Sequence, residues 1–218
     1  MPLAIFDLDD TLIAGDSASL WLRFLVQEGL ADPDMLPREE EMMRAYHHGS
    51  LEMDDYMRFT LQPLAGRSVD EVAEWAARFI DREISSLVYP QARKAVASYQ
   101  RDGWRCLVIS ATGEHVVAPI ARSLGIDEVL AIQLEIAGRH YTGSTTGILT
   151  FKQGKVDRLR QWLDANGESM NGSHGYSDSG NDIPLLETVT HAFTVNPDAR
   201  LNAHAVAARW YRLNWTRE

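Results

Sequence analysis

The order of apolar and polar positions divides this chain into stretches of different character. Residues 3–8 form a short apolar run, which predicts a buried strand. From residue 17 to about residue 82, apolar positions recur at helical spacing, and turn signals such as Asp32-Pro33 and Gly49-Ser50 separate the segments. The helical segments read SLWLRFLVQEGL, PREEEMMRAYHH, EMDDYMRFTLQPL and SVDEVAEWAARFIDREI. No strand pattern interrupts them, so we expect a block of helices.

After Tyr89-Pro90 the pattern alternates between helix and strand. Helices are expected over residues 91–101 and 198–208 and in EHVVAPIARSLG and KVDRLRQWLDANG, and strands in WRCLVIS, EVLAIQLEI, GSHGYSD and HAFTV. AGRHYTG resembles a hairpin turn, and GSTTG after it lacks the lysine of a phosphate-binding loop. Strands that alternate with helices of this length predict a doubly wound parallel sheet, an α/β fold.

The helical block directly follows the first strand, so it is expected to be an insertion into the sheet domain. We place a Rossmann-like α/β core at residues 1–15 and 89–218 and an all-helical cap at residues 16–88. Within the cap, the acidic run 39–41 is expected on a solvated helix face, and Trp21 in the apolar core. His47 and His48 lack the partner spacing of a zinc site.

Charge and cysteine content limit the possible functions. Lys and Arg total 21 against 31 Asp and Glu, which gives a net charge of −10 and argues against nucleic acid or anionic membranes as the main partner. Cys106 is the single cysteine, so a disulfide framework is excluded and a buried apolar role is expected. No targeting signal or long apolar stretch opens the chain, and we expect a cytoplasmic protein.

In open α/β sheets, ligands bind in the crevice beyond the carboxyl ends of the strands. The residues expected there are Asp7 and Asp9, then Ser110, Lys155, and Asp178 with Asp182. Carboxylates that close repel one another unless a cation faces them. Together these groups can hold a phosphate and a divalent ion.

Phosphoryl transfer needs a nucleophile, neutralised charge and a proton for the leaving group. Asp7 is placed to be the nucleophile, and Asp9 to protonate the leaving oxygen and then deprotonate water. Asp178 would complete an oxygen site for Mg²⁺. Ser110 and the backbone N–H groups after it, beginning at Ala111, would bind phosphate at a helix N-terminus.

Lys155 would offset the remaining negative charge. It is favoured over Lys152 because it follows a glycine and opens an amphipathic helix. Thr11 is expected to stabilise the first loop by hydrogen bonding, with Ser179 in a similar supporting place.

Four motifs follow one another along the chain. They are DxDxT at Asp7, Asp9 and Thr11, an apolar run ending in Ser110, Lys155 at a helix start, and SDSGND at residues 177–182. Together they resemble the motifs of the haloacid dehalogenase superfamily. The inserted helical block, YTGSTTG and VNPDARL are most similar to its phosphoserine-phosphatase-like branch.

The resemblance implies Mg²⁺ bound by Asp7, by the backbone carbonyl of Asp9 and by Asp178, with Asp182 as a nearby supporting acid. It implies hydrolysis of a small phosphorylated metabolite.

The resemblance also bears on the substrate. Asp16 stands where phosphoserine phosphatases have a glutamate, and it keeps the charge with a shorter reach. In the segment GSLEMDDYMRFTL, Met53 and Thr60 replace the aromatic residue and the arginine of those enzymes, with Arg58 nearby. An amine-bearing substrate could pair with Asp16, so phosphoserine and histidinol phosphate both stay open.

Two other functions use similar residues. A phosphomutase or phosphotransferase would use the same aspartyl phosphate with an alcohol as acceptor. A phospho-aspartate signalling module is disfavoured, because Asp9 would speed hydrolysis of the switch.

Overall fold

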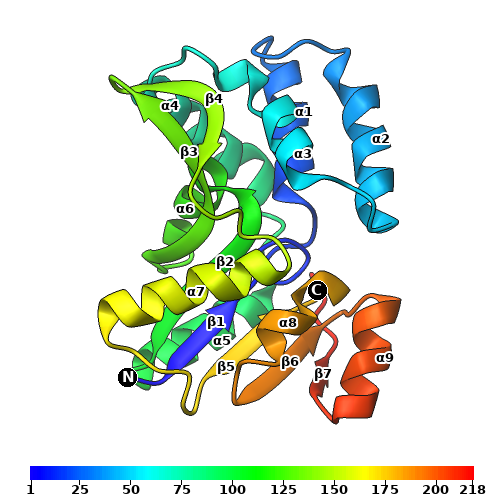
Figure 1. Ribbon diagram of the computed structural model, residues 1–218, viewed down its shortest axis with the longest axis vertical. Coiled ribbons are helices and arrows are strands. Elements are labelled where there is room, and N and C mark those ends of the chain that lie inside the picture. The colour runs from blue at the N-terminus through cyan, green and yellow to red at the C-terminus, as the bar shows by residue number, and fades with distance from the viewer.

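The computed structural model describes residues 1–218, apart from the side chain of His47, and contains a seven-stranded sheet (Figure 1). The strand order is β4-β3-β2-β1-β5-β6-β7, and all neighbours are parallel except β3 and β4. The strands are β1 (Leu3–Phe6), β2 (Arg105–Gly113), β3 (Glu128–Ala137), β4 (His140–Thr146), β5 (His174–Ser177), β6 (His191–Val195) and β7 (Tyr211–Leu213). The predicted doubly wound α/β fold is confirmed.

Strand β1 is the centre of the sheet, and its four residues are completely buried. It pairs with β2 on one side and β5 on the other, where Phe6 lies opposite Val108 and Tyr176. Because successive side chains of a strand point to opposite faces, β1 contributes to two layers of core. Leu3 and Ile5 pack in the cluster with Val156 and Leu159 of α7, whereas Phe6 packs in the cluster that includes α5.

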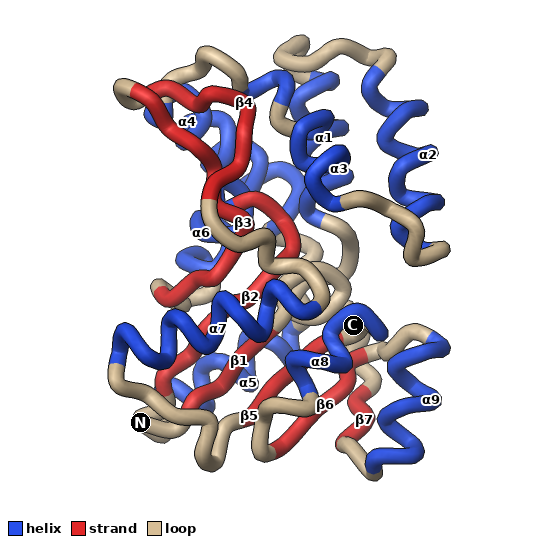
Figure 2. Tube along the Cα trace, viewed as in Figure 1, coloured by secondary structure: helices blue, strands red, loops and turns tan.

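Helices cover both faces of this sheet (Figure 2). They are α5 (Pro90–Arg101), α6 (Glu114–Ser123), α7 (Gln153–Asn166), α8 (Ile183–Leu186) and α9 (Ala199–Ala208). Helix α5 begins with Pro90 at its first position, where the missing N–H costs nothing. Helix α7 ends at Asn166 and is followed by Gly167, whose φ of 63° is the left-handed conformation that a helix C-terminus favours.

The segment between β1 and α5 consists of helices. They are α1 (Ser17–Gln27), α2 (Met35–His47), α3 (Met53–Thr60), η1 (Gln62–Leu64), α4 (Val69–Phe79) and η2 (Ile80–Ile84). A capping box between Ser68 and Glu71 begins α4. Figure 1 shows these helices together with the upper part of the β3–β4 hairpin, beyond the carboxyl ends of the central strands.

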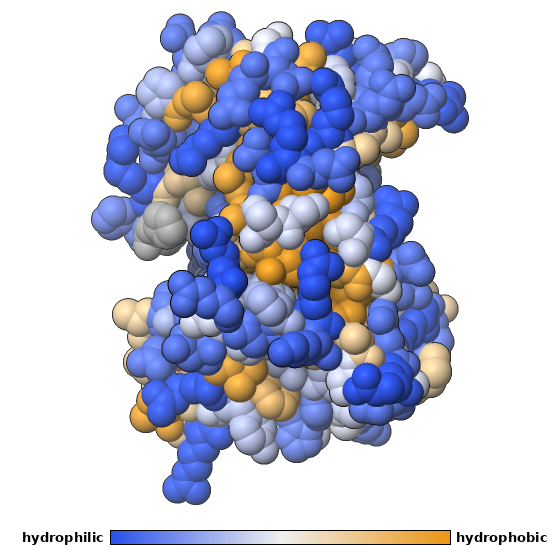
Figure 3. Space-filling model, turned by 180° about the vertical axis from the view of Figure 1, so that it is seen from behind, coloured by the Kyte–Doolittle hydropathy of each residue, from blue (hydrophilic) through white to orange (hydrophobic). Residues whose placement is uncertain are grey.

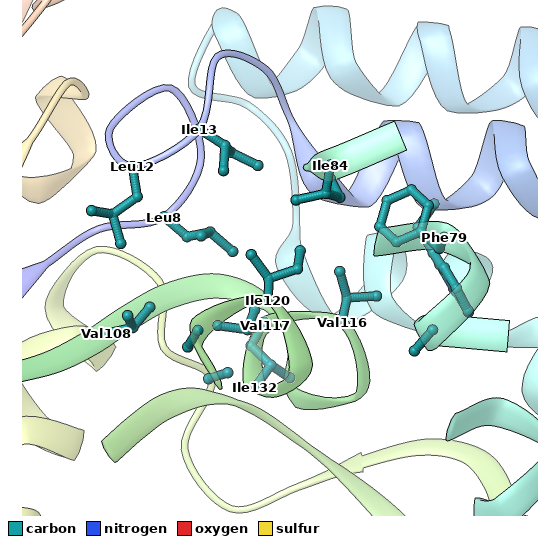
Figure 4. Packing of buried hydrophobic residues seen from close by; sticks show 14 of the residues in the cluster. Leu8, Leu12, Ile13, Phe79, Ile84, Val108, Val116, Val117, Ile120 and Ile132 are labelled. Carbon is teal, nitrogen blue, oxygen red and sulfur yellow. The ribbon is translucent and has the colours of Figure 1, made fainter. Parts of the chain in front are cut away.

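One hydrophobic core joins these helices to the sheet domain. Phe79 and Ile84 lie against Val116 and Ile120 of α6, and Ile13 lies nearby in the same cluster (Figure 4). On the rear face, hydrophobic residues also gather at the waist between the upper and lower halves (Figure 3). The helical segment is therefore packed on α6 and not held by the connecting chain alone.

Three local expectations differ from the structure. Strand β2 continues past Ser110 to Gly113, three residues beyond the predicted strand, with a register shift against β3, and α6 begins at Glu114, where the predicted helix EHVVAPIARSLG begins. Strand β7 was not expected, because it is a three-residue edge strand. Glu39 is 3% exposed and accepts a hydrogen bond from the Ser19 hydroxyl, so only part of the acidic run is solvated.

The described helices include none with the length and apolar character that a membrane crossing requires. The predicted hairpin is confirmed between β3 and β4, and Cys106 is buried in β2 as expected. The side chain of His47 lies outside the described residues, so the structure adds nothing on the histidine pair.

Candidate active site

A cavity of about 650 Å³ lies between the carboxyl ends of the strands and the helices inserted after β1. Both parts of the chain line it, including Asp7, Asp9, Asp16, Tyr56, Lys155 and Asp178. Parallel strands bring their carboxyl ends to one edge, which is why residues so far apart in the chain meet here. The cavity is large enough for a small phosphorylated metabolite.

Asp7 and Lys155 form the centre of the cavity floor. Asp7 directly follows β1, and its backbone N–H donates to the carbonyl of Tyr176 at 2.9 Å. Lys155 Nζ donates to Asp7 Oδ1 and to Asp182 Oδ2, each at 2.7 Å, and all three side chains are almost fully buried. One buried cation therefore orients two carboxylates.

Gly154 makes the approach of Lys155 possible. A Cβ at this position would lie 1.9 Å from the carbonyl oxygen of Leu149, so only glycine allows the backbone to pass so closely. The expected choice of Lys155 over Lys152 agrees with this placement, because Lys152 Nζ instead lies over the ring of Phe151.

The carboxylates outweigh the positive charge at the floor. Burial raises the pKa of Asp7 to about 6, against the opposing effect of Lys155. Burial, followed by the charges of Asp7 and Asp182, raises the pKa of Asp178 well above its usual range. Although burial lowers the pKa of Lys155, the two carboxylates outweigh it and raise that pKa. Lys155 thus stays charged, and the excess of carboxylates is suited to a further cation.

Asp9 lies beside Asp7 in a different environment. Its Oδ1 accepts from the backbone N–H of Ser17 at 2.6 Å, and its Oδ2 accepts from the hydroxyls of Thr112 at 3.0 Å and Ser110 at 3.3 Å. Burial, then the charges of Asp16 and Asp7, raises the pKa of Asp9 to about 8. A carboxyl group with that pKa is able to hand over a proton near neutral pH.

The loop after β5 brings Asp178 and Asp182 to the cavity. Ser177 Oγ donates to Asp182 Oδ2 at 2.8 Å, and the Ser179 hydroxyl accepts from the backbone N–H of Asn181 at 3.2 Å. The hydroxyl of Thr11 lies 3.2 Å from Asp178 Oδ1 and 3.4 Å from Asp7 Oδ2, so it joins the first loop to this one. Thr11 thus contacts two carboxylates of the cavity, and Ser179 lies in the loop that carries Asp178 and Asp182.

Ser110 differs from its expected role. It is completely buried inside β2, where its hydroxyl donates to Asp9 and accepts from the N–H of Thr112 at 3.1 Å. Ala111 and Thr112, and not Ser110, line the cavity. Because α6 begins at Glu114, the N–H groups after Ser110 lie in an irregular strand end and not at a helix N-terminus. The helix N-terminus expected at Ser110 is therefore wrong, while phosphate contact by Ala111 stays a prediction.

The helical side of the cavity contains some of the expected substrate residues. Asp16 and Met53 line it, and Asp16 Oδ1 also caps α1 by accepting from the N–H of Ser19 at 2.7 Å. Arg58 does not line it: its side chain is 74% exposed and pairs with Asp55 at 3.0 Å. Arg58 is therefore excluded from the proposed site.

Several residues of the site were missed at the sequence level. Thr112 donates to Asp9, and Thr150 donates to the carbonyl of Ser110 at 2.5 Å. Asp198 accepts from the N–H groups of Gly180 at 2.8 Å and Leu201 at 2.6 Å, so it joins the loop after β5 to α9. Asp198 directly precedes a helical run, and Asp is a favoured N-cap residue, so the sequence did contain a signal for its role at the start of α9.

Comparisons with known proteins agree with this arrangement. The family model described as "haloacid dehalogenase-like hydrolase" matches residues 4–187. A histidinol-phosphatase of Neisseria meningitidis is 41% identical over 220 residues, which are 98% of each chain. A phosphoserine phosphatase of Mycobacterium tuberculosis is 29% identical, with 95% of this chain and 68% of that protein covered.

Solved structures show the same fold. A Bordetella pertussis protein of unknown function has a TM-score of 0.90 and 37% identity, with 97% of each chain covered. A substrate-bound phosphoserine phosphatase has a TM-score of 0.70 at 17% identity, with 97% of this chain and 92% of that one covered. The family match covers most of the chain and begins at the strand that leads to Asp7. The chain belongs to the haloacid dehalogenase-like hydrolase family.

Proposed function

We propose that this chain is a Mg²⁺-dependent phosphatase that hydrolyses a small phosphomonoester through an aspartyl phosphate on Asp7. The observation that supports this most is the pairing of two unlike carboxyl groups at one cavity floor. Asp7 is fixed by Lys155, whereas the pKa of Asp9 is raised to about 8 beside it. A nucleophile and a proton donor are the two groups that ester cleavage requires.

In the first step, an Asp7 oxygen attacks phosphorus and the bond between phosphorus and the ester oxygen breaks. Asp9 gives its proton to the departing oxygen, which leaves as an alcohol. In the second step, water attacks phosphorus, Asp9 takes a proton from it, and the bond to Asp7 breaks to release phosphate. Lys155 orients Asp7 throughout and offsets charge on the phosphoryl oxygens.

Mg²⁺ suits the oxygen donors at this floor. Asp7, Asp178 and the backbone carbonyl of Asp9 would hold the ion, which neutralises phosphoryl charge when bound. The fit rests on the surplus of buried carboxylates over Lys155. Burial, followed by the charges of Asp7 and Asp182, raises the pKa of Asp178. Asp182 accepts hydrogen bonds from Lys155 and Ser177, so it holds Lys155 in place and is not one of the proposed ligands of the ion.

The substrate proposed is a phosphate ester whose alcohol carries an amine. Asp16 places a carboxylate on the helical wall of the cavity, where it can pair with an ammonium group. The relative that shares 41% identity over nearly the whole chain is a histidinol-phosphatase. The surface position of Arg58 leaves it unable to bind the carboxylate of phosphoserine. Histidinol phosphate is therefore preferred to phosphoserine.

The test is phosphate release by the purified protein with Mg²⁺ and no added alcohol. The panel contains histidinol phosphate, phosphoserine, phosphoethanolamine and sugar phosphates. Release that continues over many turnovers supports the phosphatase, and the amine-bearing esters should be hydrolysed fastest. Transfer that requires an added alcohol, with no free phosphate otherwise, would favour the phosphotransferase instead.

A further inference from the structure

One positively charged side chain at the mouth of the main cavity has no role in the proposed mechanism. Arg200, the second residue of α9, lines the cavity and is also exposed to solvent, so it lies where the cavity meets the surrounding water. Among the described residues, its guanidinium group has no ion-pair or hydrogen-bond partner. It is therefore available to a ligand that enters the cavity.

The chain makes room for the aliphatic part of the Arg200 side chain. A Cβ at residue 180 would lie 2.8 Å from Arg200 Cδ and 2.9 Å from Arg200 Cγ, which is too close for packed side chains, so glycine is needed here. Gly180 belongs to the loop after β5, between Asp178 and Asp182. Arg200 thus packs across the loop that brings these two carboxylates to the cavity floor, and not against the inserted helices.

The fold itself gains little from a positive charge at residue 200. The N-terminus of a helix carries partial positive charge, so anionic side chains are favoured in the first turn and cationic ones are not. The nearby carboxylate of Asp198 is engaged elsewhere. Its Oδ1 accepts from the N–H of Leu201 at 2.6 Å, and its Oδ2 accepts from the N–H of Gly180 at 2.8 Å. A role in binding explains the arginine better than a role in stability.

A phosphate ester meets mainly negative charge as it approaches this cavity. Aspartates line it on both sides, Asp16 among them, and the chain has a net charge of −10. Among the described residues that line it, Lys155 and Arg200 are the only lysine or arginine side chains. Lys155 is buried and already paired with two carboxylates, so it reaches a phosphate only at the floor. Arg200 is the positive charge that an ester can meet first.

We propose that Arg200 binds the phosphate group of the incoming ester at the cavity mouth and guides it to Asp7 at the floor. This inference rests on the proposed phosphatase function and adds to it a residue for substrate capture. A guanidinium group can donate two parallel N–H bonds to two phosphate oxygens. Because Arg200 recognises the phosphate and not the alcohol, it acts alike on every ester. It speeds binding and leaves the chemical steps to Asp7 and Asp9.

The test measures kcat and KM with saturating Mg²⁺ for histidinol phosphate, phosphoethanolamine and phosphoserine at low and high ionic strength. At about 20 mM salt, Arg200→Ala should lower kcat/KM by about five- to tenfold for all three esters, through KM, with kcat within about twofold of the parent. At about 0.5 M salt, screening should reduce this difference to about twofold or less. Arg200→Lys keeps the charge and should stay within about threefold of the parent at both salt concentrations.

The control is Arg93→Ala on α5, which removes the same charge from an exposed residue that does not line the cavity and should match the parent at both salt concentrations. An unchanged kcat/KM in Arg200→Ala at low salt, or a loss in kcat alone, would overturn the inference but leave the phosphatase intact. A loss confined to phosphoserine would also overturn it, because Arg200 would then bind the carboxylate of that alcohol. Hydrolysis of none of the esters by the parent protein would instead refute the proposed function.

Discussion

The cavity floor and a small recess beside the cavity, lined by Trp21, Tyr56 and His115, differ in how their polar atoms are paired. At the phosphate end, formed by Asp7, Asp9, Lys155, Asp178 and Asp182, the carboxylates accept hydrogen bonds from lysine, threonine, serine or backbone donors of the chain itself. In the recess, Trp21 Nε1, the Tyr56 hydroxyl and both ring nitrogens of His115 have no hydrogen-bond partner among the described residues.

The difference concerns whether the polar atoms of each place already have partners. The phosphate end is organised before substrate arrives, as expected of groups that stabilise charge in a transition state. The recess has its donors and acceptors in place but needs a ligand or a water to complete them. Under the proposed function, the phosphate end carries out the reaction.

The largest effect should come from Asp7→Asn at the phosphate end. Loss of the nucleophile should reduce kcat by at least about four orders of magnitude, as for other enzymes that use covalent catalysis. Phosphate release on phosphoethanolamine and on histidinol phosphate measures it, and both should fall together. The exposed Asp164→Asn on α7 is the control, with activity retained. An Asp7→Asn variant with more than about one hundredth of the parent's kcat would exclude Asp7 as the nucleophile.

Asp9→Asn should have the next largest effect, about 10²- to 10⁴-fold on kcat. Its size should depend on the ester. A p-nitrophenyl ester leaves easily without a proton, so its hydrolysis should suffer much less than that of an alkyl ester. The comparison is made on kcat/KM, which reports the steps up to release of the alcohol and not the shared second step; equal losses of kcat/KM for the two esters would contradict proton donation by Asp9.

Asp178→Asn should abolish stabilisation by Mg²⁺. An ion at one hundred times its dissociation constant stabilises a folded protein by about 2.7 kcal/mol, which raises the Tm of a chain of this size by about 5–10 °C. The parent protein should show this rise, and so should the exposed control Asp127→Asn. A full Mg²⁺-dependent rise in Asp178→Asn would remove this residue from the ion site.

The value of kcat/KM should decrease at alkaline pH. Burial, then Asp16 and Asp7, raises the pKa of Asp9 to about 8, and a general acid must be protonated in the free enzyme. Activity should therefore decline as pH rises through about 8. Asp16→Asn removes one of the charges that raise this pKa, so the decline should move to lower pH by up to about one unit. The exposed Asp54→Asn should not move it.

Arg58→Ala should have the smallest effect. The side chain is 74% exposed and forms a surface ion pair with Asp55, a type of pair that contributes about 0–1 kcal/mol. We expect less than a twofold change in kcat/KM for every ester of the panel. A selective loss on phosphoserine would show that Arg58 reaches the substrate after all.

The phosphate end was more accessible from sequence than the recess. Strand ends in a parallel sheet meet at one edge, so the apolar run before Asp7 and the helix start at Lys155 were sufficient to bring these residues together. Ser110 was harder to place, because the strand pattern of WRCLVIS does not show that β2 continues to Gly113. Its hydroxyl supports Asp9 as a result.

The recess depends on tertiary packing that local patterns do not encode. Trp21, Tyr56 and His115 come from three helices separated widely in sequence, and each fits an ordinary core position. Glu39 was misplaced for the same reason, because its burial depends on how α2 meets α1. The short edge strand β7 has too few residues for its alternation to be visible.

The central claim is that phosphate passes through Asp7. The most direct measurement is acid quenching of the enzyme during turnover of histidinol phosphate with Mg²⁺, followed by peptide mass spectrometry. We predict one added phosphoryl group on the peptide that contains residue 7, labile at alkaline pH and missing from Asp7→Asn. Rapid turnover with a phosphoryl group on some other side chain, or an Asp7→Asn enzyme that still carries the label, would contradict the account.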